Sequence, residues 1–390
     1  TRRTPIHSWH EKNNAKFEDV GQWKRAWYFP SRKENMYDAV QRESKAARTS
    51  AGILDASTLG KIDIQGSDAS EFLNRIYTNA WSKLAIGKCR YGLMLNDDGM
   101  VYDDGVTTRL DENHYIMTTT TGGAATVMSK LEDFLQTEWP ELKVYLTSVT
   151  DHFATVSVCG PNSKKILEKV TQNIDYSDTN FPHMSFRNGL IDKINCRVMR
   201  ISFTGELSYE INVQANYGQS VWEKCIAVGK EYGITPYGTE TMHLLRAEKG
   251  FIIVGQETDG TVTPVDLQMD WIISKKKYDF IGKRSLYRSD TIREDRKQYV
   301  GLITKDPNEI LEEGAQIVAE IKNKPPMDMI GHVTSSYYSP NLNKSIALAV
   351  VKNGRKLKGK KLYVPMPNKI IEVTVSDTIF LDKEGERLNA

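Results

Sequence analysis

The sequence contains few cysteines and none of the short motifs that mark metal, phosphate or hydrolytic sites. Its 390 residues include four cysteines, which are widely spaced and form no CxxC pair, so a disulfide scaffold is not indicated. There is no Walker loop, no GxGxxG after a strand, no HExxH and no GxSxG. This argues against nucleotide-phosphate binding, metalloprotease chemistry and serine hydrolysis. The seven histidines are scattered, and we expect no metal centre.

Long apolar runs and an excess of one charge are also missing. No stretch of about 18 apolar residues occurs, so no transmembrane helix is expected. The 52 Lys and Arg residues nearly balance the 50 Asp and Glu residues. Because the two signs are interspersed, we expect neither a nucleic-acid partner nor a membrane partner. The spacing of the cysteines fits reduced thiols, and we expect a cytoplasmic protein.

The chain is long enough for two or three domains. Up to about residue 290, repeated β-α-β units with antiparallel hairpins predict an α+β fold rather than a doubly wound parallel sheet. From about Asp295 onward, short strands alternate with turns rich in Gly, Pro, Asn and Lys, a pattern typical of a small barrel or sandwich. We therefore divide the chain into a first region, 1–290, and a C-terminal β-barrel, 296–385.

The most informative segment is Lys88–Val106. An apolar strand over Tyr91–Leu95 precedes the turn N-D-D-G, and a second strand over Met100–Tyr102 ends in Asp103 and Asp104. This is a strong hairpin signal. Successive strand side chains face opposite sides, so one carboxylate is directed inward and needs partners or a task. The alternative is that both carboxylates cap the end of the strand in solvent.

The remaining candidates for chemistry are aromatic and acidic side chains near glycine turns: Tyr91, Asp104, Phe203, Glu206 and Glu210. Aromatic walls with one or two placed acids suit a planar heteroaromatic ligand, because a carboxylate accepts paired N–H donors from such a ring. In the alternative interpretation, Tyr91 and Phe203 belong to the core, with Phe203 ending a strand over Val198–Phe203. Glu210 is then a solvated strand residue.

Several segments, in order along the chain, resemble the folate-dependent aminomethyltransferase family, which includes the T-protein of the glycine cleavage system. They are Gly52–Ser57, Tyr91 with Asp103 and Asp104, Phe203–Glu210, Arg246–Glu248, Asp279–Lys283 and Gly331–Ala349. Others resemble the carboxyl-terminal part of the α subunit of heterotetrameric sarcosine oxidase, a branch of this family: Phe17–Arg25, Leu54–Lys61, Gln136–Pro140 and Tyr237–His243. The two sets are spread, in order, over nearly all of the chain.

The resemblance implies a cloverleaf fold of two intertwined α+β modules plus a C-terminal barrel, with tetrahydrofolate near the centre. It implies that Asp104 is the catalytic acid beside the folate N10 and that Tyr91 and Phe203 contact the folate. It further implies that Glu210 holds the pterin N–H groups. Two more folate-site positions differ from the T-protein, with Leu59 in place of Met and Thr120 in place of Asn. Met242 stands where the T-protein has an Arg that helps to hold the ligand.

The sarcosine oxidase branch implies a specific reaction. The chain would accept the methylene group of a sarcosine-derived imine and form 5,10-methylenetetrahydrofolate and glycine. The flavin would lie on or with a partner subunit, since the sequence has no flavin-binding fingerprint, and the chain would be a piece of a longer subunit. Two alternatives stay open: a stand-alone folate-dependent aminomethyltransferase or demethylase for another small donor, and a non-catalytic folate-binding regulatory module.

Overall fold

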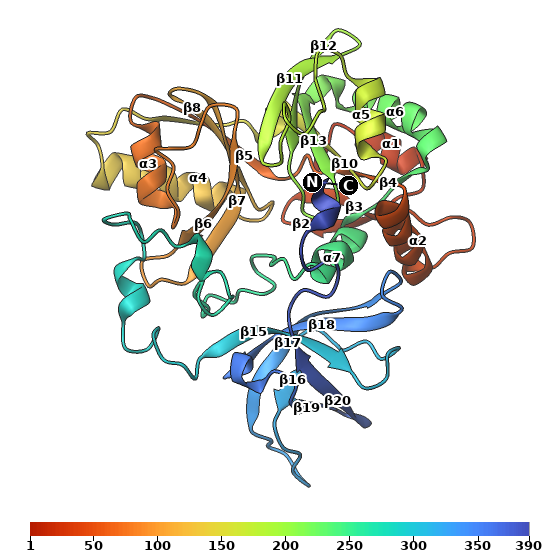
Figure 1. Ribbon diagram of the computed structural model, residues 1–390, viewed down its shortest axis with the longest axis vertical. Helices are drawn as coiled ribbons and strands as arrows, with labels where there is room; N and C mark the ends of the chain where they lie inside the picture. Colours follow the sequence, from red (N-terminus) through yellow and green to blue (C-terminus); the bar gives the residue numbers. More distant parts are fainter. Residues whose placement is uncertain (390) are drawn as a thin grey trace.

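The computed structural model describes residues 1–389, which form three lobes around a common centre (Figure 1). Its strands build a six-stranded sheet, a five-stranded sheet, a closed six-stranded barrel and a small three-stranded sheet. Sheets with mainly antiparallel neighbours and helices on their outer faces confirm the α+β class. None of the helices within the described residues is long and apolar enough to cross a bilayer.

The six-stranded sheet has the order β11-β12-β13-β10-β4-β14. Its strands are β4 Ala51–Asp55, β10 Phe153–Cys159, β11 Ser185–Ile191, β12 Ile194–Arg200, β13 Ser208–Gln214 and β14 Ile234–Pro236. One face is apolar, with Val156, Val158, Tyr209 and Ile211 buried against α5 (Ser163–Val170) and α6 (Gly218–Gly229). The opposite face is therefore left to line the interior of the molecule.

The five-stranded sheet has the order β6-β7-β8-β5-β9. Its strands are β5 Gly60–Gln65, β6 Cys89–Leu95, β7 Val101–Asp111, β8 His114–Thr119 and β9 Tyr145–Ser148. On β5, Ile62 and Ile64 are buried beneath α3 (Ala69–Ile76) and α4 (Ala124–Asp133), which continues as the π-turn Phe134–Glu138. The alternation on β5 sends Lys61 and Asp63 to the other face.

The two modules are intertwined. β4 belongs to the six-stranded sheet, β5 to β9 form the five-stranded one, and β10 returns to pair with β4, with Val156 opposite Asp55. The five-stranded module is thus inserted between two neighbouring strands of its partner.

The third lobe is a closed barrel with the order β15-β18-β17-β16-β19-β20. Its strands are β15 Lys297–Thr304, β16 Gln316–Val318, β17 Met329–Ser339, β18 Lys344–Lys352, β19 Lys361–Met366 and β20 Lys369–Ser376. Closure leaves no open edge, which decides for the barrel over the sandwich. Our proposed boundary at 290–296 lies just before β15.

The N-terminal segment is more regular than its sequence suggests. It forms the small sheet β1-β3-β2 (Arg2–Arg3, Trp23–Tyr28 and Lys16–Val20) and the short helix α1 (His7–Lys12). Trp23 and Phe29 are buried. Further 3-10 turns are at Thr150–His152, Ala215–Tyr217, Lys230–Tyr232, Asp270–Ile272, Arg284–Tyr287, Gly354–Leu357 and Glu386–Asn389.

Two central helices tie the lobes together (Figure 1). Helix α2 (Met36–Thr49) begins at Asn35, whose side chain accepts a hydrogen bond from the Asp38 amide. Helix α7 (Thr239–Glu248) ends at Glu248, which accepts hydrogen bonds from Ser339 and Asn341 of the barrel lobe. A buried ion pair between Arg48 and Glu248 joins the two helices, so the six-stranded module and the barrel share one polar junction.

Two expected strand boundaries are wrong. β7 does not end before the acidic pair but runs on to Asp111, because Asp103 and Asp104 pair with Met94 and Leu93 of β6. β12 ends at Arg200, so Phe203 lies in a loop beyond the sheet.

Candidate functional site

The β6–β7 hairpin brings Tyr91 and Asp104 together. Asp104 is opposite Leu93 and Tyr91 is opposite Val106, so both side chains project from the same face of the sheet. The Tyr91 hydroxyl donates a hydrogen bond of 2.6 Å to Oδ2 of Asp104. Burial raises the pKa of Asp104 to about 7, the Tyr91 hydrogen bond opposes the rise, and the charge of Asp103 adds to it. At neutral pH this carboxyl group can therefore both hold and release a proton.

Asp103 projects from the opposite face and is 2% exposed. Its carboxylate accepts hydrogen bonds from the Thr120 amide at 3.3 Å and the Thr120 hydroxyl at 3.2 Å. Burial raises its pKa to about 6. Neither aspartate is a solvated cap, so that interpretation is wrong. The Thr120 hydroxyl also accepts a hydrogen bond from the Gly123 amide at the start of α4, at 3.1 Å.

Glu210 comes from the other sheet. It lies in β13 opposite Ser157 of β10 and Met199 of β12. Its neighbours Tyr209 and Ile211 are buried on the α5–α6 face, so Glu210 points to the interior face. Its carboxylate makes no hydrogen bond or ion pair to any residue in 1–389, and it is half-buried rather than solvated. Burial raises its pKa to about 7, against the effect of the Lys61 ammonium group.

The interior faces of the two sheets contact each other next to these residues. The Thr108 hydroxyl of β7 lies 3.4 Å from the sulfur of Met199 and 3.2 Å from that of Cys89. Met199 is the residue directly opposite Glu210. The carboxylates of Asp104 and Glu210 therefore belong to facing layers of one interface.

Phe203 and Leu59 lie in loops, outside the strands that carry the two carboxylates. Phe203 is 36% exposed and stacks on Phe251, with ring centroids 6.2 Å apart and planes inclined by 22°. It is thus not a core residue. Leu59 is half-buried, and its carbonyl accepts a hydrogen bond from Lys61 at 2.9 Å.

Glu206 has a structural role. Its Oε1 accepts hydrogen bonds from Arg48 at 2.9 Å and Arg387 at 2.6 Å, and its side chain is 1% exposed. Both hydrogen bonds belong to the polar junction between the lobes. We therefore remove Glu206 from the list of ligand-binding candidates.

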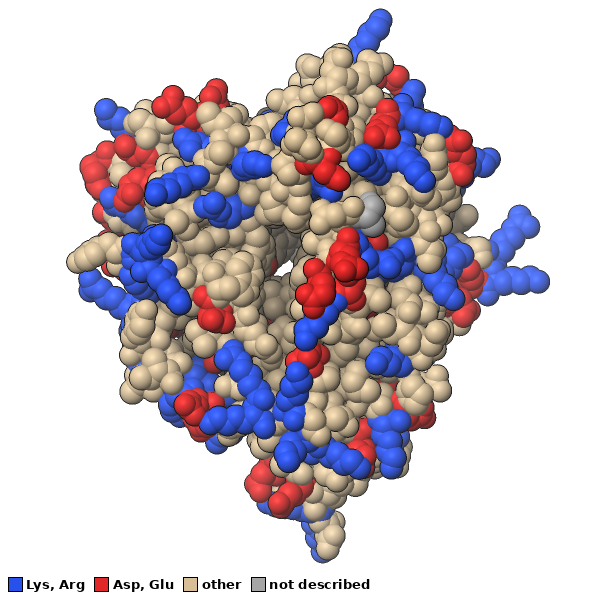
Figure 2. Space-filling model, viewed as in Figure 1, with Lys and Arg blue, Asp and Glu red and all other residues tan. Residues whose placement is uncertain are grey.

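An open groove reaches this region along the outer edge of β6. It has a volume of about 580 Å³ and is lined by Asn79, Ala80, Cys89, Arg90, Tyr91, Met184, Trp271, Ile272 and Ser274. Figure 2 shows a narrow opening where the three lobes meet, with acidic side chains along one side. Tyr91 thus faces both the sheet interface and a passage to the surface.

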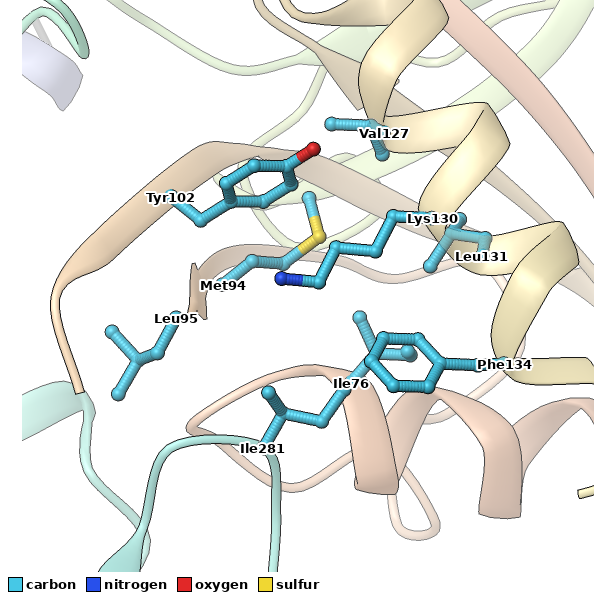
Figure 3. A pocket seen from close by; sticks show the side chains of 9 residues that line it. All are labelled: Ile76, Met94, Leu95, Tyr102, Val127, Lys130, Leu131, Phe134 and Ile281. Carbon is cyan, nitrogen blue, oxygen red and sulfur yellow. The ribbon is translucent and has the colours of Figure 1, made fainter. Parts of the chain in front are cut away.

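A second pocket lies on the outer face of the same sheet, beneath α3 and α4 (Figure 3). Lys130 extends there between Tyr102 and Phe134, with its ammonium group 4.2 Å from the Tyr102 ring centroid. The pocket holds about 10 Å³, which is room for roughly one water molecule. It contains none of the expected site residues and is too small for a ligand of the implied size.

Sequence reasoning missed Lys61, Phe251 and the groove. Lys61 was read only as part of a matching segment. The alternation of Lys61 and Asp63 with two isoleucines could have marked an interior polar face. Phe251 lies outside helices and strands, and Trp271 lies in the short 3-10 turn Asp270–Ile272, so neither gives such a signal. In residues 1–389, no group of three or more His, Cys, Asp or Glu side chains could hold a metal ion.

Comparison with family models covers most of the chain. The family described as "GCVT N-terminal domain" matches residues 6–277, and "Glycine cleavage T-protein C-terminal barrel domain" matches residues 297–382. The fold also matches the crystal structure of glycine cleavage system aminomethyltransferase T from Bartonella henselae. The TM-score is 0.85 at 23% identity, covering 98% of each chain. The expected cloverleaf fold is confirmed.

Among curated proteins, sarcosine oxidase subunit alpha of Corynebacterium sp. (strain P-1) is 55% identical, over 99% of this chain and 40% of that protein. The subunit of the same name from Rhizobium meliloti (strain 1021) is 42% identical, over 100% of this chain and 40% of that protein. An aminomethyltransferase from Thermoanaerobacter pseudethanolicus is 30% identical over 99% of both chains. This chain therefore spans about 40% of the length of those alpha subunits.

These matches confirm the resemblance seen in the sequence, including the greater similarity to sarcosine oxidase alpha subunits than to the aminomethyltransferases compared here. They also confirm the expected class of enzyme at the level of the family. The chain belongs to the glycine cleavage T-protein family of aminomethyltransferases.

Proposed function

We propose that this chain catalyses tetrahydrofolate-dependent one-carbon transfer at the interface between its two sheets. The observation that carries the proposal is the pairing of Asp104 with Tyr91 on one sheet, facing a layer in which Glu210 has no protein partner among the described residues. Family membership over most of the chain supports it.

The residues present fit a reduced pterin. A half-buried carboxylate without a partner is costly unless a ligand supplies donors, and Glu210 is such a group. Paired N–H groups on a planar ring satisfy a carboxylate well. The rings of Tyr91 and Phe203 offer flat apolar surfaces to such a ligand. We propose that Glu210 fixes the orientation of the ligand while the aromatic rings exclude water from its faces.

Asp104 is the proposed catalytic group. Tetrahydrofolate, when bound, supplies the nitrogen atoms that accept the one-carbon unit. The pKa of Asp104, raised by burial to about 7, lets its carboxyl group exchange a proton near neutral pH, which is the property a general acid–base needs. Tyr91 holds Oδ2 of this carboxyl group in place. We also propose that Leu59 and Thr120 border the bound folate.

We further propose that the donor is a sarcosine-derived imine and that the products are 5,10-methylenetetrahydrofolate and glycine. The support is the 55% identity to a protein named sarcosine oxidase subunit alpha. In this proposal the flavin lies on or with a partner subunit, and the reaction takes place in the cytoplasm. The four cysteines, all free and buried, are compatible with that location.

The experiment measures 5,10-methylenetetrahydrofolate formation from sarcosine and tetrahydrofolate, with and without a flavoprotein partner. Asp104→Asn should lower folate-dependent turnover by about 10²-fold, the usual scale for a positioned acid or base. Sarcosine oxidation at the flavin should persist in the variant. Folate-dependent turnover that is unchanged in Asp104→Asn overturns the assigned role.

A second candidate is a stand-alone aminomethyltransferase or demethylase for another small donor. The match over 99% of both chains to an aminomethyltransferase favours it. It predicts product from tetrahydrofolate and a donor without any flavoprotein. Tight folate binding with no product from any donor would instead indicate a non-catalytic folate-binding regulatory module.

A further inference from the structure

Lys61 is a buried cation on the interior face of the five-stranded sheet. It lies in β5 opposite Thr118 of β8, and its side chain is 2% exposed. Lysine is almost never fully buried unless its charge is paired. Within residues 1–389, however, Lys61 has no carboxylate at ion-pair distance. Its charge is therefore not used in a structural salt bridge.

The ammonium group is held in place by the backbone. Nζ donates to the carbonyl oxygens of Ser57 at 3.1 Å and Leu59 at 2.9 Å. Both belong to the turn between β4 and β5, which links the two sheets. An ammonium group has three donors, so this anchoring uses two of them. The cation is thus fixed at the sheet interface with a definite direction.

Glu210 is the interior carboxylate on which this charge acts. The turn that anchors Lys61 is bonded to the sheet that carries Glu210: the Ser57 hydroxyl accepts a hydrogen bond from the Thr155 amide of β10 at 3.0 Å. The Thr155 hydroxyl in turn donates to Asn212 at 2.6 Å, and Asn212 lies two residues from Glu210 on the same face of β13. The positive charge of Lys61 lowers the pKa of Glu210, which burial raises to about 7. Reciprocally, burial lowers the pKa of Lys61 to about 8, and Glu210 is the first of the carboxylates that oppose this, ahead of Asp55 and Asp151.

Two of the other titratable groups near Glu210, the Cys89 thiol and the Tyr237 hydroxyl, are neutral at pH 7. Burial raises the pKa of the Cys89 thiol to about 12, and the pKa of Tyr237 is raised by burial as well, with a smaller contribution from Glu210 in both cases. The charged Arg197 lies on the interior face of β12, two residues from Met199. Its electrostatic partners are Asp63 and Cys89 rather than Glu210.

We propose that Lys61 is a positioning residue for the proposed folate site: its fixed ammonium group keeps the Glu210 carboxylate anionic, so that it accepts N–H donors from the ligand. This inference rests on the proposed function. It predicts that ligand affinity falls below a certain pH, which is set by the Lys61 charge on one sheet and the Glu210 carboxyl group on the other. Lys61 acts through Glu210 and does not itself touch the reacting atoms.

The test is the pH dependence of binding of 5-formyltetrahydrofolate, measured by calorimetry from pH 6 to 8.5. For the unmodified chain, affinity should fall as pH drops through the Glu210 transition near pH 7. Lys61→Gln keeps donors for the two carbonyls but removes the charge. It should move the midpoint up by about one unit, the lower end of the range for losing one charge partner, which weakens binding about threefold at pH 7.5.

Four further variants separate charge from structure. Lys61→Met is a second neutral variant and should move the midpoint in the same direction, while Lys61→Arg should restore it. Lys130→Met, which removes a half-buried lysine from the outer face of the same sheet (Figure 3), should leave it unchanged. Glu210→Gln should abolish the transition, with or without Lys61→Gln.

The outcomes distinguish this inference from the proposed function. If the unmodified chain does not bind 5-formyltetrahydrofolate, the proposed function fails. If it binds, but folded Lys61→Gln and Lys61→Met variants keep the midpoint of the unmodified chain, the role of Lys61 is wrong and the proposed function stands. A shift of equal size in Lys130→Met also overturns the inference.

Discussion

Arg48 and Glu248, which are 200 positions apart in the chain, form an ion pair of 2.7 Å in which the side chains are 2% and 0% exposed. The same guanidinium group binds Glu206 at 2.9 Å. One side chain thus joins α2, α7 and the loop after β12. The junction depends on this guanidinium group, because without it the buried Glu248 loses its ion pair and Glu206 keeps only Arg387.

We predict that Arg48→Met lowers the free energy of unfolding by about 3–5 kcal/mol, the usual cost of leaving buried charges unpaired. Denaturant unfolding followed by circular dichroism measures it. The control is Arg2→Met, which breaks an ion pair between Arg2 and Asp151 whose side chains are 39% and 70% exposed. It should cost less than about 1 kcal/mol. Similar losses in both variants would contradict the assigned importance of the junction.

Replacing Tyr91 by Phe tests the link between this hydroxyl and the proposed acid. Its hydrogen bond lowers the pKa of Asp104, so Tyr91→Phe should raise that pKa. The limb of the pH–rate profile of folate-dependent turnover that reports Asp104 should move to higher pH. Tyr102→Phe, in the outer pocket, is the control and should not move the limb. If the limb does not move in Tyr91→Phe, the Tyr91 hydroxyl does not control the protonation of the proposed acid.

The stability of the folded chain should depend on pH through the protonation of Glu43. This carboxyl group is 0% exposed, and burial raises its pKa to about 7, against hydrogen bonds from Thr241, Phe29 and Gly238. A raised folded-state pKa means that the folded chain keeps a proton that the unfolded chain releases from about pH 4.5 upward. The stability that this proton provides is present at low pH and is lost as pH rises to about 7.

Melting temperatures from pH 5 to 8 check this for Glu43→Gln. The stability of the unmodified chain relative to the variant should decrease as pH rises across this range. Glu34→Gln is the matched control, because a hydrogen bond from Arg42 lowers the pKa of Glu34 to about 2. Its contribution is complete above pH 5, so the difference should stay flat. A flat difference for Glu43→Gln would rule out a protonated Glu43 in the folded chain.

Phe203→Ala should separate binding from stability. The ring is 36% exposed and stacks on Phe251 outside the sheets. Its loss should therefore change the melting temperature little. Folate affinity should fall about fivefold, the equivalent of roughly 1 kcal/mol for an aromatic contact. Calorimetry with 5-formyltetrahydrofolate measures this, and undiminished affinity would remove Phe203 from the proposed site.

Local sequence pattern was sufficient to predict the hairpin that carries Tyr91 and the strands of the barrel. Turn residues and alternation specify such elements within a few residues of the chain. The length of β7 was not predictable in this way. It depends on pairing with both β6 and β8, with irregular register between Met94 and Leu95 and between Arg109 and Asp111. The pattern over Met100–Tyr102 covers only the beginning of that strand.

The site itself could be predicted only in part. That Asp103 and Asp104 face opposite ways follows from strand geometry, and the structure agrees. That Lys61 and Glu210 meet at one interface does not follow, because it depends on how two sheets pack whose strands are about 150 positions apart in sequence. The hydrogen bond from the Thr120 hydroxyl to Asp103 does not follow from local pattern either, because the two residues lie 17 positions apart, one on β7 and the other just after β8.

The insertion of β5 to β9 between paired strands has an evolutionary and practical consequence. Because Asp55 of β4 lies directly opposite Val156 of β10, the segment leaves and re-enters its host across one interstrand spacing of about 4.8 Å. Because the two ends of the segment lie so near each other, the segment can be exchanged without shifting the register of the host sheet, as in tolerated domain insertions. A chimera that takes residues 57–152 from a related chain is therefore expected to keep the host sheet intact and to bring its own Asp104 equivalent with it.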